Sequence, residues 1–258
     1  MCYNTGVGEN MIKKHKGLNI FITLSVLFGV PMTIVGAMAI DNAVERCNLA
    51  SEKEKYKDVL PYLLTTQNGM PLKAKVDKPI TVGINMSEAE REQAVKAIND
   101  IQDISNTINY KILDTGETGV YADINLSIEP NMAEQSHAFG RANLTYDTKT
   151  GYINYPITIT IDDSIINYKS TQGVNLVNYV VKHEMMHTLG FRDMKDEQYY
   201  NKTVMWYAVQ DGMELDDFST LDKNNIKSMY DNKTITVQRP NNISFVCKVK
   251  QKEDEYSM

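Results

Sequence analysis

Hydrophobic residues in the central part of the chain alternate with polar ones in several short segments. Ile80, Val82 and Ile84 follow this pattern, which predicts a half-buried strand. The segments 108–113 (INYKIL) and 122–128 (ADINLSI) are similar, and the hydrophobic residues of the second are again in step. We therefore expect three strands in the first half of an ordered domain.

The segment after the first strand has the spacing of a helix. Ser87 followed by Glu90 is the signature of a capping box, in which the two side chains bind the first free N–H groups of a helix. Ala94, Ile98 and Ile101 then share one helical face. We expect a helix that begins at Ser87 and buries this face against the sheet.

Two more strands and two more helices are predicted downstream. The strands 141–146 (RANLTY) and 152–161 (YINYPITITI) are joined by a hairpin-type connection, and Pro156 requires a bulge or an irregular start. A helix is expected from about residue 172 to 189, and a short closing helix over 219–230. This order of elements predicts an α+β (α/β-like) domain with a mixed sheet.

The N-terminal 39 residues have the composition of an export signal. Three lysines precede an uncharged apolar run over 18–39, which is long enough to span a membrane. The Ala37-Met38-Ala39 end favours a cleaved signal peptide over a retained membrane anchor. Both interpretations place the rest of the chain outside the cytoplasm, secreted or held at the membrane by this segment alone.

The remaining residues divide into three parts. Residues 40–78 are charged and then rich in turn-forming residues, which predicts a linker or a short pro-segment. The ordered domain is expected over 79–230, and 231–258 is a C-terminal extension with two strand-like pieces. Cys47 and Cys247 could pair, could be free thiols, or Cys47 could block a metal in a latent form.

The charge balance excludes one class of partner. The formal net charge is −6, and the part after the lysine-bearing leader is more acidic still. Binding to a nucleic-acid backbone requires clustered Lys and Arg, and the sequence has no such cluster. We therefore expect no nucleic-acid partner; the sequence does not indicate an oligomeric state.

The stretch 183–193 (HEMMHTLGFRD) carries the candidate chemistry. Residues four apart share a helical face, so His183 and His187 can bind one metal ion, and Glu184 can reach a water beside it. The preceding residues are apolar, and burying these polar groups is costly unless they have partners. Gly190 can end the helix and turn the chain, so that Asp193 returns to the ion.

The pattern H-E-x-x-H-x-x-G-x-x-D resembles the zinc signature of the metzincin (matrixin- and snapalysin-like) metallopeptidases, in the variant in which aspartate replaces the third histidine. The segment TVMWYAV offers Met205 for the methionine-bearing turn of that family. The resemblance covers roughly residues 79–230. It implies a twisted, mostly parallel sheet, an active-site helix and a small C-terminal subdomain.

The resemblance also implies an activity, that of an exported zinc endopeptidase acting on peptides or proteins. His183, His187 and Asp193 would hold Zn2+, and Glu184 would be the general base. Tyr207 resembles the tyrosine that some metzincins move toward the metal. The strand 141–146 would be the edge strand that binds the extended substrate.

Several alternatives remain open at this point. His137 could be a rival ligand, and a gluzincin-type peptidase would take Glu197 or Glu214 as its third ligand. A catalytically inactive, zinc-stabilised extracellular binding module would use the same histidines without turnover. Met205 fits ordinary core packing, and Tyr207 fits an exposed aromatic at the rim of a cleft.

Overall fold

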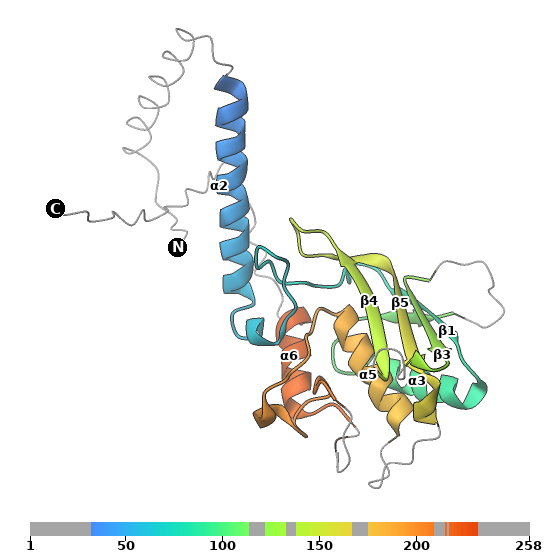
Figure 1. Cartoon of the computed structure of the whole chain (residues 1–258). Helices are drawn as coiled ribbons and strands as arrows, with labels where there is room; N and C mark the ends of the chain where they lie inside the picture. Colours follow the sequence, from blue (N-terminus) through green and yellow to red (C-terminus); the bar gives the residue numbers. More distant parts are fainter. Residues whose placement is uncertain are drawn as a thin grey trace. The chain divides into compact units, whose positions relative to one another are not determined.

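The structure is a computed structural model of the whole chain, and it describes residues 32–113, 122–132, 138–166, 175–208, 215 and 217–231 (Figure 1). The chain divides into two units between Lys55 and Tyr56. The helix α2 (Met32–Lys55) belongs to the first unit and continues through the expected cleavage point after Ala39. In the described part of the chain, no helix combines the length and apolar character that a membrane span needs.

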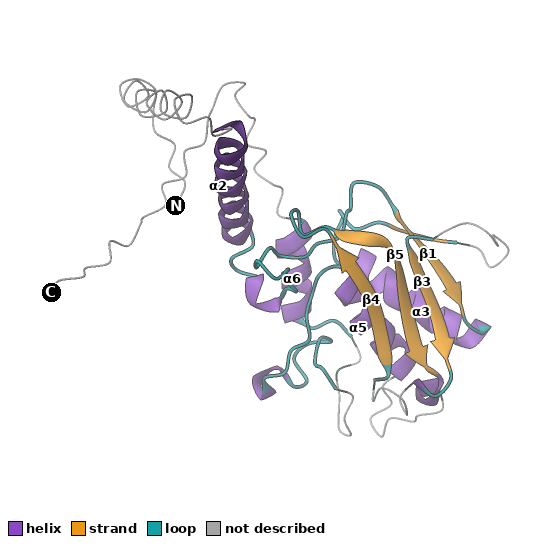
Figure 2. Ribbon diagram, turned by 45° about the horizontal axis from the view of Figure 1, so that its top comes forward, coloured by secondary structure: helices purple, strands orange, loops and turns teal. Residues whose placement is uncertain are grey.

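The second unit is built on one five-stranded sheet with the strand order β2-β1-β3-β5-β4 (Figure 2). Its strands are β1 (Ile80–Asn85), β2 (Tyr110–Ile112), β3 (Ile124–Glu129), β4 (Gly140–Tyr146) and β5 (Ile153–Asp162). All neighbouring strands are parallel except β4, which pairs antiparallel with β5 and forms one edge. The expected mixed α and β class with a mostly parallel sheet is confirmed.

Two helices cover one face of this sheet. The helix α3 (Glu88–Gln102) packs beside β1 and β2, and α5 (Leu176–Thr188) packs beside β4 and β5 (Figures 1 and 2). Isoleucines of the strands, such as Ile124 and Ile159, are fully buried against them. The helix α6 (Thr220–Tyr230) and three short 3-10 helices complete the described elements: η1 (Leu60–Tyr62), η2 (Asp163–Ile166) and η3 (Glu197–Tyr199).

The helix starts differ in part from the prediction. Ser87 is the N-cap residue of α3, but its side chain makes no capping hydrogen bond, so the expected capping box is wrong. A complete capping box is present at α6 instead, between Ser219 and Asp222. The peptide bond before Pro156 is cis, and the β4–β5 register shifts between Asn143 and Thr145.

The segment before β1 belongs to the same compact unit as the sheet. The expected domain started at residue 79, whereas the unit starts at Tyr56. Leu63 and Leu72 are buried in the core, and the Leu64 N–H donates to the Gly190 carbonyl over 2.7 Å. This segment therefore supports the turn that follows α5.

Some predictions concern residues that lie outside the described ones. These are most of the apolar run 18–39, Cys247 with the C-terminal strands, and the rival ligands His137 and Glu214. The pairing of Cys47, the export signal and the anchor therefore stay predictions.

Candidate metal centre

The helix α5 carries the candidate ligands on a mostly buried scaffold. Val180 and Val181, one turn before the histidines, are 3% and 0% exposed, as the apolar sequence of this helix predicts. At its other end Gly190 adopts a φ of +95°, and a side chain there would meet the Leu72 carbonyl oxygen at 2.2 Å. Only glycine fits this sharp turn, which brings residues 191–193 back along the helix.

Both imidazole rings are oriented by backbone carbonyl groups. His183 Nδ1 lies 2.8 Å from the Val204 oxygen, and His187 Nδ1 lies 2.8 Å from the Phe191 oxygen. A carbonyl oxygen can only accept, so each Nδ1 carries the proton and donates it. With Nδ1 engaged by a carbonyl, Nε2 is the ring nitrogen that each histidine has left to bind a metal.

Asp193 completes a group of three converging atoms. Its Oδ1 lies 3.1 Å from His183 Nε2 and 3.3 Å from His187 Nε2. A tetrahedral ion with bonds of about 2.0–2.1 Å would hold its ligand atoms about 3.3 Å apart. Asp193 Oδ1 is thus spaced from each Nε2 as two neighbouring ligand atoms of one such ion would be.

The electrostatics of this group favour a cation between its members. Burial by itself raises the pKa of Asp193, but the hydrogen bonds and charges of the two histidines outweigh it and hold that pKa well below its usual range. Burial lowers the pKa of His183, yet Asp193, Glu184 and the Val204 carbonyl together raise it above the usual value. Three electron-pair donors facing one another require a proton or a metal ion to balance them.

Asp193 is held in place through its chain neighbour Met194. The Met194 N–H donates to the Met205 carbonyl over 2.8 Å, and the Tyr207 N–H donates to the Met194 carbonyl over 3.3 Å. The segment around Met205, where the sequence predicts a methionine turn, is therefore hydrogen-bonded to the strand-like segment that follows Asp193. Met205 itself is 3% exposed and packs in the core.

Asp222, in the first turn of α6, holds the segment just before Met205 in place. Its buried carboxylate accepts from the Thr203 hydroxyl and, over 3.1 Å, from the Val204 N–H. It also accepts from the N–H and hydroxyl of Ser219. Asp222 thus holds the N–H side of Val204, whose carbonyl accepts from His183 Nδ1 and, over 3.2 Å, from the Tyr179 hydroxyl.

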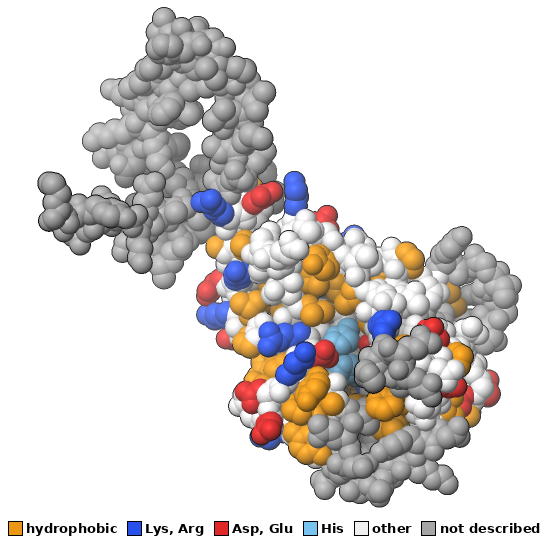
Figure 3. Space-filling model, in the orientation of Figure 1, with side chains coloured by type: hydrophobic (Ala, Val, Ile, Leu, Met, Phe, Trp, Pro, Cys, Tyr) orange, Lys and Arg blue, Asp and Glu red, His pale blue; other side chains and the backbone are white. Residues whose placement is uncertain are grey.

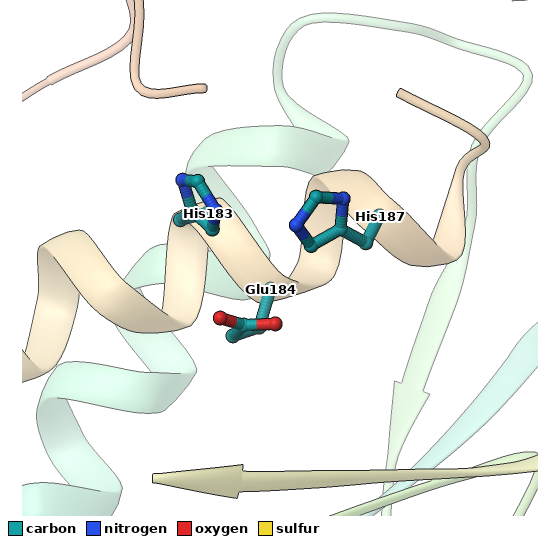
Figure 4. A group of neighbouring side chains, drawn as sticks. All are labelled: His183, Glu184 and His187. Carbon is teal, nitrogen blue, oxygen red and sulfur yellow. The ribbon is translucent and has the colours of Figure 1, made fainter. Parts of the chain in front are cut away.

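Glu184 points to another side of α5 from the two imidazoles (Figure 4). The two histidines and Glu184 offer ligand atoms within 4.8 Å of one another. Asp193 is the other candidate for a third ligand, since its Oδ1 lies 3.1 Å and 3.3 Å from the two Nε2 atoms. Glu184 is 4% exposed, and this burial raises the pKa of its carboxyl group, although the two histidines and the Ala142 backbone oppose the shift.

The site opens to a cleft of about 480 Å³. One wall is the edge strand β4, where residues 140–142 pass next to Glu184, and the floor is formed by α5. In the space-filling view the described histidines reach the surface as one pale-blue patch beside an acidic side chain (Figure 3). The candidate ligands are therefore open to a substrate from one side.

Aromatic side chains also line the cleft. Tyr207 is 50% exposed and lines the cleft, and its ring lies 4.9 Å from the ring of Trp206. The indole Nε1 of Trp206 is buried and finds no hydrogen-bond partner among the described residues. Tyr207 thus lines the cleft, and its exposure fits both interpretations, a rim aromatic and a hydroxyl donor.

Three residues of the site gave no signal in the sequence. A side-chain carbon on Gly140 would lie 2.5 Å from Glu184 Oε1, so this glycine lets β4 approach the carboxylate. Asp222 and the fully buried Lys182 act through partners far away in the chain. The rival ligand Glu197 is exposed in η3, outside the convergent group.

No model of a known protein family matches this sequence, and no curated protein matches it significantly. The interpretation of the site therefore depends on its geometry and chemistry.

Proposed function

We propose that this chain is a zinc-dependent endopeptidase of the metzincin type. The observation that carries the proposal is the position of Asp193 Oδ1 in an open cleft. This atom lies 3.1 Å from His183 Nε2 and 3.3 Å from His187 Nε2. Two imidazoles and one carboxylate are a donor set that suits zinc and leaves one tetrahedral position for a reactant. A purely structural zinc site is normally closed by a fourth protein ligand.

The bound metal would supply Lewis acidity, which polarises the carbonyl group of the scissile peptide. Proton transfer is the role of Glu184. Its Oε1 lies against β4 at the wall of the cleft, beside the group of ligands. The carboxylate accepts a proton from the attacking water and passes it to the leaving amine nitrogen. Burial raises the pKa of Glu184, which brings it closer to the pH at which both transfers are efficient.

The strand β4 offers a surface for an extended peptide. One side of β4 pairs with β5, and the other side borders the cleft. An unpaired strand edge presents N–H and C=O groups to which a substrate backbone can add as a further strand. Such pairing recognises the peptide backbone irrespective of sequence and holds the scissile bond beside Glu184. Peptides and proteins are therefore the proposed substrates.

Tyr207 is proposed as a hydroxyl donor to the developing oxyanion. Its exposed ring lines the same cleft as β4. A donor aimed at the charge that forms in the transition state lowers the barrier without tightening substrate binding.

The proposal is tested by replacing Glu184 with glutamine in the full chain. The Glu184→Gln variant should retain zinc and cleave a peptide library about 10²–10⁴-fold more slowly than the parent, because the general base is removed. Glu197→Gln, an exposed position in η3, is the matched control and should cleave at the parent rate.

Three outcomes would contradict the proposal. Cleavage by Glu184→Gln at the parent rate would remove Glu184 from the mechanism. A zinc-loaded parent that cleaves no member of the library would favour the inactive binding module instead, and a loss of zinc in Glu197→Gln would favour the gluzincin arrangement.

A further inference from the structure

Lys182, the residue directly before His183, is a buried charge that the proposed mechanism does not use. Its side chain is 0% exposed, although an ammonium group is costly to remove from water unless it is paired. Neighbouring residues on a helix point about 100° apart. Lys182 therefore leaves α5 on a different side from the imidazole of His183.

The ammonium group binds two carboxylates from different elements. Nζ lies 2.8 Å from Oδ2 of Asp100 in α3 and 3.0 Å from Oδ1 of Asp217, just before α6. It also lies 5.3 Å from the centre of the Phe218 ring. One side chain thus joins α5 both to α3 and to the segment that leads into α6.

The attachment to Asp217 continues back to the metal centre. Two residues after Asp217, Ser219 caps α6 and shares hydrogen bonds with Asp222. The Asp222 carboxylate accepts from the Val204 N–H, and the Val204 carbonyl accepts from His183 Nδ1 over 2.8 Å. This series of contacts therefore starts at Lys182 and ends at His183, the next residue of α5.

The other end of α6 is also attached to α5. The Tyr230 hydroxyl donates to the Leu189 carbonyl over 2.6 Å and accepts from the Ala74 N–H over 3.0 Å. With Lys182 at its start and Tyr230 at its end, α6 is held at two points along α5. It is a rigid element whose first turn can set the position of Val204.

We propose that Lys182 is a positioning residue that, through its ion pair with Asp217, holds the start of α6 and thereby keeps the Val204 carbonyl in place to orient His183 for metal binding. The inference rests on the proposed metal centre. It assigns to Lys182 an effect on metal affinity that is separate from its effect on stability.

The exposure of Asp100 and Asp217 makes it possible to measure the effect of Lys182 on metal affinity separately from its effect on stability. The side chains of Asp100 and Asp217 are 26% and 58% exposed, so both carboxylates can be hydrated when Lys182 is replaced. Removing one partner of a buried ion pair is destabilising mainly because the other charge is left buried and unpaired, and here both remaining carboxylates reach water. Lys182→Met should therefore fold, but it loses the ion pair that keeps Asp217 in place.

The experiment compares Lys182→Met, Asp217→Asn and the double variant with the parent, all as full chains. Zinc affinity is measured by competition with a chelator, and the absorption spectrum of bound Co2+ reports the ligand geometry. We expect about tenfold weaker zinc binding and an altered Co2+ spectrum in each single variant, at the lower end of the effects of groups that orient a ligand. The double variant should lose no more than either single one.

Lys223→Met is the matched control. Its Nζ lies 3.9 Å from the same Asp217 carboxylate, but the side chain is 45% exposed, so the variant should bind zinc as the parent does. Val82→Ala, in β1, controls for general destabilisation, since it weakens the core without touching this path.

Two results would overturn the inference. Parent-like zinc affinity and Co2+ spectra in Lys182→Met or in Asp217→Asn would leave Lys182 with a structural role alone. Asp217→Asn changes an exposed side chain and so provides the answer if Lys182→Met does not fold. A parent chain that binds neither ion would overturn the proposed function itself, and the inference with it.

Discussion

Gly140→Ala should separate metal binding from catalysis more cleanly than a change to any ligand. The glycine lies at the start of β4, and no left-handed backbone conformation is required there. An added side-chain carbon would lie 2.5 Å from Glu184 Oε1, 2.8 Å from Glu184 Cγ and 2.6 Å from Val180 Cγ1. The perturbation is therefore a contact with the proposed general base.

The size of the effect follows from these distances. Non-bonded heavy atoms in contact normally lie about 3.5 Å apart, so the Glu184 carboxylate must move by about 1 Å. A displacement of about 1 Å in a catalytic group can cost about 10²-fold in rate. The end of the flexible Glu184 side chain should yield before α5 does, which leaves His183 and His187 in place.

The assay measures kcat on a peptide substrate together with zinc affinity. We expect Gly140→Ala to lose about 10²-fold in kcat and to bind zinc as tightly as the parent. Gly83→Ala, in β1 of the same sheet, is the matched control, because its nearest contact is the Ala122 Cβ at 3.3 Å. It should keep the parent kcat.

Two results would refute this reasoning. Parent-like kcat in Gly140→Ala would mean that the Glu184 carboxylate does not need its position under β4. A large loss of zinc affinity would mean that α5 moves instead, so that the histidines and the base are not independent.

Three further predictions concern the surroundings of the metal. Asp193→Ala should weaken zinc binding by more than about 100-fold, which exceeds the effect of groups that only orient a metal ligand. Asp196→Ala should leave zinc affinity unchanged, and equal affinities of the two variants in a chelator competition would remove Asp193 from the site. Asp222→Ala should lower the free energy of unfolding by about 2–5 kcal/mol in urea titrations, because it leaves buried N–H groups unpaired, and a change below about 0.5 kcal/mol would contradict its anchoring role. Tyr207→Phe should lower kcat by about 10²-fold with little change in KM if the hydroxyl donates to the oxyanion, and an unchanged kcat would leave a rim aromatic.

The elements were predictable because local patterns decide them. The alternation of Ile80, Val82 and Ile84 matches the buried face of β1, and the closing helix expected over 219–230 is α6 apart from its N-cap residue. The capping box at Ser87 was wrong because the signature describes what two side chains can do, and here Ser87 takes the N-cap position without the side-chain bond.

The site was predictable only as far as it is local in sequence. His183, His187 and Asp193 lie within 11 residues, so helical spacing and one glycine turn suffice to bring them together. His187 is oriented by the Phe191 carbonyl, only four residues on, but the contacts behind His183 are long-range: Asp222 is 18 residues from Val204, and Asp217 is 35 residues from Lys182. No spacing rule connects such pairs, because the folded sheet and helices decide which of them meet.

The central claim is that one group of side chains holds a metal ion, and a zinc titration of the metal-free full chain tests it most directly. The parent should take up one zinc ion per chain in competition with a chromophoric chelator, since three protein ligands converge on one position. A variant with both His183→Ala and His187→Ala should take up none. Parent and double variant with the same uptake would contradict the account.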